Sequence, residues 1–148
     1  MSNPTPIPFS TTLHIKDHCL CLHAQRAARA LARRFDRALK PTGMTSGQFS
    51  LMMSLNRPQP APLGSVAQLL GLDRTTLTAA LKPLERQQWV EIAKGAEDRR
   101  ERFLSLTPEG QRALAAAVPI WVATHAEIET HMPQGEADRL RHGLLALS

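Results

Sequence analysis

Three arginines, Arg99, Arg100 and Arg102, stand close together in the segment GAEDRRERFLSLT, residues 95–107. Like charges repel one another, and a negatively charged partner such as a polyanion would relieve that repulsion. Three acidic residues in the same segment nearly neutralise the cluster, so its composition is also typical of a solvated turn. The elements that position the arginines decide between these two interpretations.

Two alternating apolar and polar runs flank the cluster and predict a β-hairpin that carries the arginines at its tip. The runs are WVEIAK, residues 89–94, and RFLSLT, residues 102–107. An apolar residue at every second position is the pattern of a half-buried strand. Directly afterwards, Thr107, Pro108 and Glu109 predict the beginning of a helix, because each residue type is favoured at its position there.

The segment before the hairpin predicts two helices joined by a tight turn. Ser65 and Gln68 form a capping pair for the first helix, which we expect to end at Leu70, with Gly71 supplying the left-handed exit. Asp73 is expected to cap the second helix. Two helices joined by a three-residue turn that contains glycine form a helix-turn-helix, and a hairpin directly after it makes a winged helix.

The second of these helices has an apolar face that must pack inward and an opposite face that is short, polar and cationic. The polar face suits the major groove of a nucleic-acid duplex. Threonine and alanine methyl groups can contact thymine methyls, hydroxyls can bind bases or phosphates, and Arg74 can read guanine. The members of this face are Arg74, Thr75, Thr78, Ala79, Lys82 and Arg86.

Further helices are expected on both sides of the winged helix. Residues 1–12, with three prolines, predict a flexible arm or a loosely docked strap, and one long helix is expected from about Lys16 to Leu39. The capping pair Thr45 and Gln48 predicts a short helix. A long helix after Thr107 carries an apolar stripe, and a last helix from about residue 134 to residue 146 exposes leucines on one side.

Composition indicates one domain whose positive charge is unevenly distributed. The chain has 148 residues and a formal charge of +5, of which residues 1–102 contribute +7 and residues 103–148 contribute −2. No apolar run is long enough to cross a membrane and the start does not resemble a signal peptide, so we expect a cytoplasmic protein without a membrane partner. Cys19 and Cys21 are only two positions apart, which on a helix argues against a disulfide between them.

The order of these elements resembles the MarR family of bacterial transcriptional regulators. The resemblance rests on LGLDRTTLTAALKPLERQQWVE and DRRERFLSLTPEG, in which the wing pattern D-x-R-x-x-x-L-x-L-T begins at Asp98 and Arg100. It implies a mainly α-helical α+β fold, with a small β-hairpin wing on a winged helix-turn-helix. It also implies that Arg100 enters a minor groove of double-stranded DNA, oriented by Asp98, while Arg99 and Arg102 bind phosphates.

The resemblance further implies how the chain is organised and what it does. A single domain, residues 1–148, contains a DNA-binding lobe, residues 45–107, and dimerisation helices in residues 1–40 and 108–148. The expected function is that of a sequence-specific regulator, a repressor, that binds a pseudo-palindromic operator as a homodimer. A small-molecule effector, often aromatic in this family, would release it from DNA.

The signal that controls the protein stays open between three hypotheses. Arg29 and Arg33 are candidates to hold the carboxylate of an effector, and Trp89 or Trp121 to line an apolar pocket. Cys21 aligns with the reactive cysteine of hydroperoxide-sensing family members, although this chain lacks the tyrosines that activate it there. A buried, inert thiol is the competing interpretation of Cys21.

A metal-responsive regulator is the third hypothesis, and solvated surface histidines are the competing interpretation. Histidines, cysteines and one glutamate recur at spacings that could bind metal, but no compact two-cysteine, two-histidine pattern is present, so no metal site and no cofactor are predicted. The residues concerned are His14, His18, Cys19, Cys21, His125, Glu129 and His131. The absence of a phosphate-binding loop, a nucleophile elbow or an HExxH motif argues against an enzyme.

Overall fold

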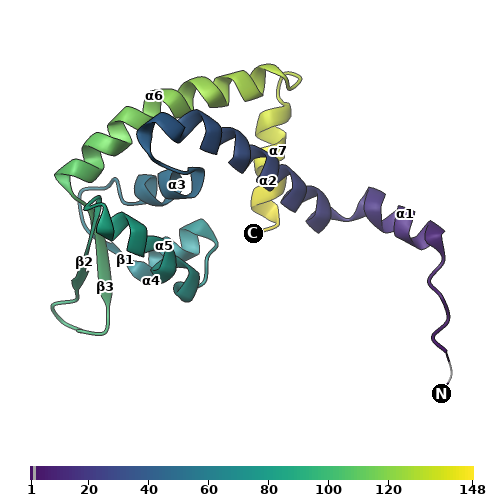
Figure 1. Cartoon of the computed structure of the whole chain (residues 1–148), viewed down its shortest axis with the longest axis horizontal. Coiled ribbons are helices and arrows are strands. Elements are labelled where there is room, and N and C mark those ends of the chain that lie inside the picture. The colour runs from purple at the N-terminus through teal and green to yellow at the C-terminus, as the bar shows by residue number, and fades with distance from the viewer. Residues whose placement is uncertain (2) are drawn as a thin grey trace. The chain divides into compact units, whose positions relative to one another are not determined.

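The computed structural model describes residue 1 and residues 3–148, and divides the chain into two compact units, residues 1–34 and residues 35–148. The first unit contains helix α1 (Phe9–His18) and most of helix α2 (Leu20–Leu39). The second unit contains the end of α2 and all the remaining elements, and Figure 1 labels the helices and strands of both.

The expected bounds of the N-terminal arm, residues 1–12, and of the single helix from about Lys16 are wrong, because residues 9–12 are already helical; residue 2 of the expected arm lies outside the described residues. Helix α1 already begins at Phe9, because the prolines of the N-terminal segment end at Pro8, where a fixed φ of −60° is compatible with a helix start. The helical path is interrupted at Cys19, whose ψ of 109° is extended. Two helices therefore replace the single predicted one.

The second unit begins with the end of α2, the short 3-10 helix η1 (Lys40–Thr42) and helix α3 (Ser46–Ser54). The predicted cap of α3 is confirmed: the Gln48 amide donates to Thr45 Oγ1 over 3.2 Å, and the Thr45 amide donates to Gln48 Oε1 over 3.0 Å. Helix α3 places Phe49 and Met52 in the core, as its spacing predicts.

The helix-turn-helix consists of α4 (Leu63–Leu70) and α5 (Arg74–Arg86). Gly71 adopts the left-handed conformation between them, with φ of 66°, as predicted. The predicted capping pair of α4 is wrong, because the N-cap is Pro62, three residues before Ser65. Ser65 consequently lies inside the helix and donates its hydroxyl hydrogen to the Pro62 carbonyl over 2.9 Å.

A three-stranded antiparallel sheet follows, in the order β1, β3, β2. Strands β2 (Val90–Lys94) and β3 (Arg102–Leu106) form the predicted hairpin. Strand β1 (Ala61–Pro62) was not predicted; it pairs with Leu104 and Phe103 on the other side of β3. The hairpin β2–β3 with its tip, residues 95–101, is called the wing below.

The chain ends in helices α6 (Pro108–Thr130) and α7 (Glu136–Ala146). The predicted cap of α6 is confirmed, since the Gly110 amide donates to Thr107 Oγ1 over 2.9 Å. The apolar face of α5 packs with β3, α4 and α6 into one core, in which the most deeply buried side chains include Leu39, Met52, Val66, Leu77, Leu81, Leu84 and Leu104. No helix in the described part of the chain is both long and apolar enough to cross a membrane.

Candidate nucleic-acid interface

Helix α5 presents the predicted polar face to solvent. All six side chains assigned to this face are exposed, while Leu77, Leu81 and Leu84 on the opposite face are buried. The hydroxyl of Thr78 donates its hydrogen to the Arg74 carbonyl over 2.7 Å, so towards a partner Thr78 offers its methyl group and an acceptor oxygen. The short side chains of Thr75, Thr78 and Ala79 allow this face of α5 to approach the base edges in a groove.

Asp73 fixes the beginning of α5. Its carboxylate accepts hydrogen bonds from the Thr76 amide, over 2.7 Å, and from the Thr76 hydroxyl, over 3.0 Å. The bond from the Thr76 amide, followed by that from the hydroxyl, lowers the pKa of Asp73 below its ordinary value. The predicted cap is confirmed, and the negative charge of Asp73 lies at the positive end of the helix.

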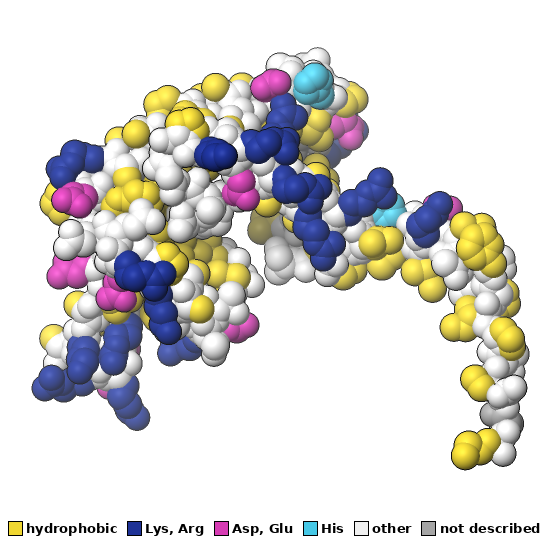
Figure 2. Space-filling model, in the orientation of Figure 1, with side chains coloured by type: hydrophobic (Ala, Val, Ile, Leu, Met, Phe, Trp, Pro, Cys, Tyr) yellow, Lys and Arg dark blue, Asp and Glu magenta, His cyan; other side chains and the backbone are white. Residues whose placement is uncertain are grey.

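The wing tip is closed by its own backbone. The Gly95 amide donates to the Glu101 carbonyl over 3.1 Å, and the Glu101 amide donates to the Asp98 carbonyl over 3.1 Å. A Cβ atom on Gly95 would lie only 2.4 Å from the Asp98 carbonyl oxygen, so the close approach of backbone at this position requires glycine. Figure 2 shows Lys and Arg side chains gathered around this end of the hairpin.

Asp98 and Arg100 form the pair that the sequence predicts. Asp98 Oδ1 accepts from the Arg100 amide over 2.9 Å and from Arg100 Nε over 3.3 Å, and Oδ2 accepts from Nη2 over 3.5 Å. The bond from the Arg100 amide, and then those from its side chain, lower the pKa of Asp98 below its ordinary value. The side chain of Arg100 is nevertheless 93% exposed. Asp98 therefore holds Arg100 while leaving the guanidinium in solvent.

The other two wing arginines differ from each other. Arg102 donates from Nη1 to the Arg99 and Glu101 carbonyls, over 2.8 and 3.0 Å, and is half-buried at the base of the tip. Arg99 is exposed at the outer end of the tip. The family resemblance predicts that both bind phosphates, and the structure shows that Arg102 stabilises the turn.

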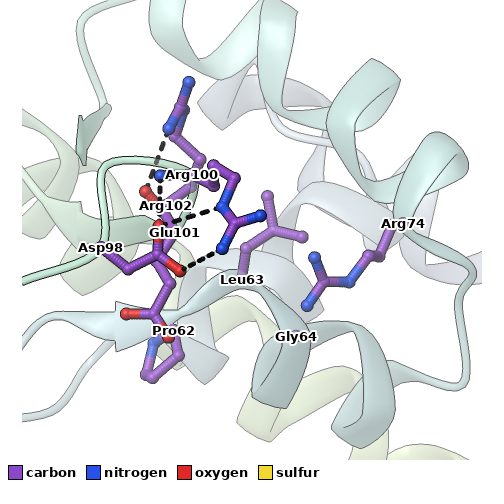
Figure 3. Close-up of a pocket in the computed structure, with 8 residues that line it drawn as sticks. All are labelled: Pro62, Leu63, Gly64, Arg74, Asp98, Arg100, Glu101 and Arg102. Carbon is purple, nitrogen blue, oxygen red and sulfur yellow. Dashed lines mark hydrogen bonds and ion pairs between the residues drawn. The ribbon is translucent and has the colours of Figure 1, made fainter. Parts of the chain in front are cut away.

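A cavity of about 270 Å³ lies between the wing, α4 and α5. Its lining contains three arginines, Arg74, Arg100 and Arg102, two acids, Asp98 and Glu101, and the first residues of α4, with Gly64 among them (Figure 3). Gly64 was missed by the sequence analysis. The role of Gly64 depends on its contact with Arg74, ten positions later, and no local sequence pattern predicts such a contact.

A second, apolar cavity of about 520 Å³ lies between α3, α4 and α6. Apolar side chains dominate the wall, and the remaining lining residues are the serines Ser50 and Ser54; the apolar ones are Phe49, Met53, Leu69, Leu70, Val118, Trp121 and Val122. Trp121 stacks on Phe49, with ring centroids 6.1 Å apart. This cavity contains one of the two tryptophans proposed for an effector pocket.

The other candidates for effector binding are Trp89, Arg29 and Arg33. Trp89 lies at the start of the wing, partly buried against the core, and is not among the lining residues of the apolar cavity. Arg29 and Arg33 are exposed on α2, in the first unit of the chain. No charged side chain of the described residues lines the cavity.

Both cysteines are free thiols. Cys19 lies at the break between α1 and α2, so the premise that both cysteines are helical is wrong. Cys21 is exposed, and Gln25 Nε2 donates to its Sγ over 3.4 Å. The interpretation of Cys21 as a buried thiol therefore fails for the single chain.

Two of the residue pairs considered for metal binding lie close together in the structure. His14 and His18 stack with centroids 4.3 Å apart, and His125 Nδ1 lies 3.6 Å from Glu129 Oε1. Across the residues that the structure describes, no three His, Cys, Asp or Glu side chains come together as a metal site would need. The histidines, cysteines and glutamate considered for metal binding therefore do not form one cluster among the described residues.

The architecture defines a winged helix-turn-helix protein. The model of the MarR family matches residues 44–101. The chain belongs to that family, whose members are transcriptional regulators and not enzymes.

Three relatives illustrate the relationship. The Mycobacterium tuberculosis transcriptional regulator MosR, solved in complex with DNA, is 35% identical with a TM-score of 0.80, over 88% of this chain and 93% of that one. The HTH-type transcriptional regulator YwoH of Bacillus subtilis is 31% identical over 59% of this chain and 63% of its own length. The organic hydroperoxide resistance transcriptional regulator of Bacillus subtilis is 27% identical over 72% of this chain and 74% of its length. The chain spans 51% to 63% of the length of the first two curated relatives it matches.

Proposed function

We propose that this protein is a transcriptional repressor that binds a pseudo-palindromic site in double-stranded DNA as a homodimer. The observation that carries the proposal is Arg100, a guanidinium 93% exposed at a hairpin tip and held by Asp98, on the same lobe as the exposed cationic face of α5. A helix in the major groove and an arginine in the adjacent minor groove are complementary to one duplex. MosR, which is similar over nearly the whole chain, binds DNA.

The salt dependence of duplex binding tests this proposal. Neutralised phosphates release counterions, so the affinity should fall linearly with salt on logarithmic axes, with a slope of about −0.9 for each phosphate contact. Fluorescence anisotropy with duplexes selected from a random pool measures both the slope and the sequence preference. A protein that binds no duplex in dilute buffer is not a DNA-binding regulator.

The apolar cavity is proposed as the effector site. Its wall contains aromatic and aliphatic side chains and two serines, without a charged residue among those described, so it suits an uncharged aromatic molecule. This differs from the carboxylate expected on Arg29 and Arg33, which remains an alternative. Occupation of the cavity would release the repressor from its operator.

Tryptophan fluorescence tests the effector site. In a Trp89→Phe variant, the remaining emission comes from Trp121, which lines the cavity. An uncharged aromatic compound that binds there should change this emission and lower the affinity for DNA over the same concentration range. A compound that lowers DNA affinity without changing the emission of Trp121 binds elsewhere.

Thiol oxidation is a second candidate for the signal, because Cys21 is exposed and accepts a hydrogen bond from the Gln25 side-chain amide. The similarity to an organic hydroperoxide resistance regulator supports it. Treatment with an organic hydroperoxide should then modify Cys21, as read by mass spectrometry, and release DNA. A Cys21→Ser variant that responds like the wild type rules this signal out.

A further inference from the structure

The arginine-lined cavity between the wing, α4 and α5 has a composition that suits one phosphodiester. Three arginines and two acidic residues are among those that line it, so the formal charges of its lining residues sum to +1. A phosphodiester carries one negative charge. Asp98 is already bonded to Arg100, so its carboxylate is satisfied within the protein and does not repel an incoming anion with its full charge.

The contact between Arg74 and Gly64 in this cavity was not predicted from the sequence. A Cβ atom on Gly64 would lie 2.8 Å from Arg74 Nη2 and 3.7 Å from its Cζ. The guanidinium of Arg74 therefore lies against the bare backbone at the start of α4, on the side of the wing (Figure 3). It lies in the cavity between the two DNA-facing elements, and this location favours the sugar-phosphate backbone over a base edge.

The N-terminus of α4 adds an electrostatic field that attracts anions. The structure shows no side-chain cap on this eight-residue helix, and the first amides of a helix have no acceptor within it. Those amides and the positive end of the helix dipole attract anions. Gly64 belongs to this first turn, and the Arg74 guanidinium lies where a side chain on Gly64 would begin.

The geometry of a DNA duplex indicates which group would bind in the arginine-lined cavity. When α5 lies in the major groove and the wing lies in the adjacent minor groove, the strand that separates the two grooves must pass between them. We infer that the arginine-lined cavity holds one phosphodiester of that strand, that Arg74 binds this phosphate instead of reading guanine, and that Gly64 leaves the space Arg74 needs. This inference rests on the proposed function.

A duplex with single neutral linkages tests the assignment. The probe is a duplex selected from a random pool by the wild-type protein, with one methylphosphonate placed at each backbone position in turn. At the phosphate assigned to Arg74, one per half-site, we expect the wild-type affinity to fall about tenfold, as for a lost charge-assisted contact. That position should lie on the strand between the two grooves.

The variant Gly64→Ala displaces Arg74 without removing its charge, because the contacted atom is the end of a flexible side chain. Its affinity for the unmodified duplex should fall about tenfold, and the salt slope should decrease by about 0.9 per protomer. A methylphosphonate at the assigned position should then cause no further loss of affinity in the Gly64→Ala variant. The melting temperature should stay level or rise, since alanine favours a helix more than glycine does.

Two comparisons decide the result. Gly47→Ala, at a glycine of α3 with open space around it, should bind like the wild type. Arg74→Ala should reproduce the loss seen in Gly64→Ala and leave the selected bases unchanged. If Arg74→Ala relaxes the preference for a guanine, or if Gly64→Ala keeps the full sensitivity to the methylphosphonate, Arg74 is not the phosphate ligand. A wild-type protein that binds no duplex instead overturns the proposed function.

Discussion

Arg100 is positioned by a residue two places before it, and this pairing decides what its removal should do. The guanidinium is 93% exposed and its bonds are to Asp98, so no core contact depends on it. Arg100→Ala should therefore leave the folded chain intact and weaken operator binding by about 1–3 kcal/mol, the range for one good groove contact. Anisotropy at a fixed salt concentration measures the loss, and unchanged binding would contradict the role of the wing.

The pKa of Asp98 leads to a prediction for acid. Hydrogen bonds from Arg100 lower this pKa below the ordinary value of 3.8, so the folded chain keeps the carboxylate ionised to lower pH than the unfolded chain does. The stabilising contribution is complete above the ordinary value and is lost as the pH falls through the lowered one. NMR of the Asp98 carboxyl carbon should give a midpoint below 3.8, and Arg100→Ala should move it upward. A midpoint at the ordinary value would show that the pair is not formed in solution.

Among the elements, the junction between the wing and α6 depends on one glycine. A Cβ atom on Gly110, in the first turn of α6, would lie 2.0 Å from the Trp89 carbonyl oxygen, and this neighbour is backbone. Gly110→Ala should destabilise the fold by about 1–3 kcal/mol, as overpacking does. Denaturant unfolding measures the change. Gly143→Ala, at an open position inside α7, is the matched control and should be neutral or stabilising.

Elements determined by neighbouring residues were predictable from the sequence. The caps at Thr45, Asp73 and Thr107 each use a hydrogen bond that spans three residues, and the hairpin follows from alternation on both sides of a charged turn. The exposed polar side of α5 was predictable for the same reason, because the helical period separates it from the buried leucines.

Features that depend on distant contacts were missed. Strand β1 has two residues and exists only because it pairs with Leu104 and Phe103, some forty positions later. The start of α4 moved to Leu63 because Pro62 serves as its N-cap, and the contact between Gly64 and Arg74 arises from the approach of two helices. Local sequence patterns do not indicate which distant residues will be in contact, so the arginine-lined cavity could not be predicted.

At the scale of the whole molecule, the exposed leucines of α7 bear on assembly. Leu140 and Leu144 are four positions apart on one face and are 51% and 47% exposed, and Leu147 follows at 63%. Monomeric proteins cover most side chains of this kind, whereas a partner chain that buries them contributes favourable free energy. The proposed homodimer provides such a partner. Two copies of the wing and α5 would then contact the two halves of a pseudo-palindromic site.

Sedimentation equilibrium tests this assembly. The wild-type chain should sediment as a dimer at micromolar concentration, and Leu140→Glu with Leu144→Glu should shift it to the monomer, because two carboxylates would otherwise be buried in the interface. The same variant should lose most of its affinity for a two-half-site duplex and less for a single half-site, since one lobe still binds. Ser65→Glu with Gln68→Glu, an exposed pair on α4 outside the expected dimerisation helices, adds the same charge as a control and should remain dimeric. A wild-type monomer, or a leucine variant that stays dimeric, would exclude α7 as the dimer-forming surface.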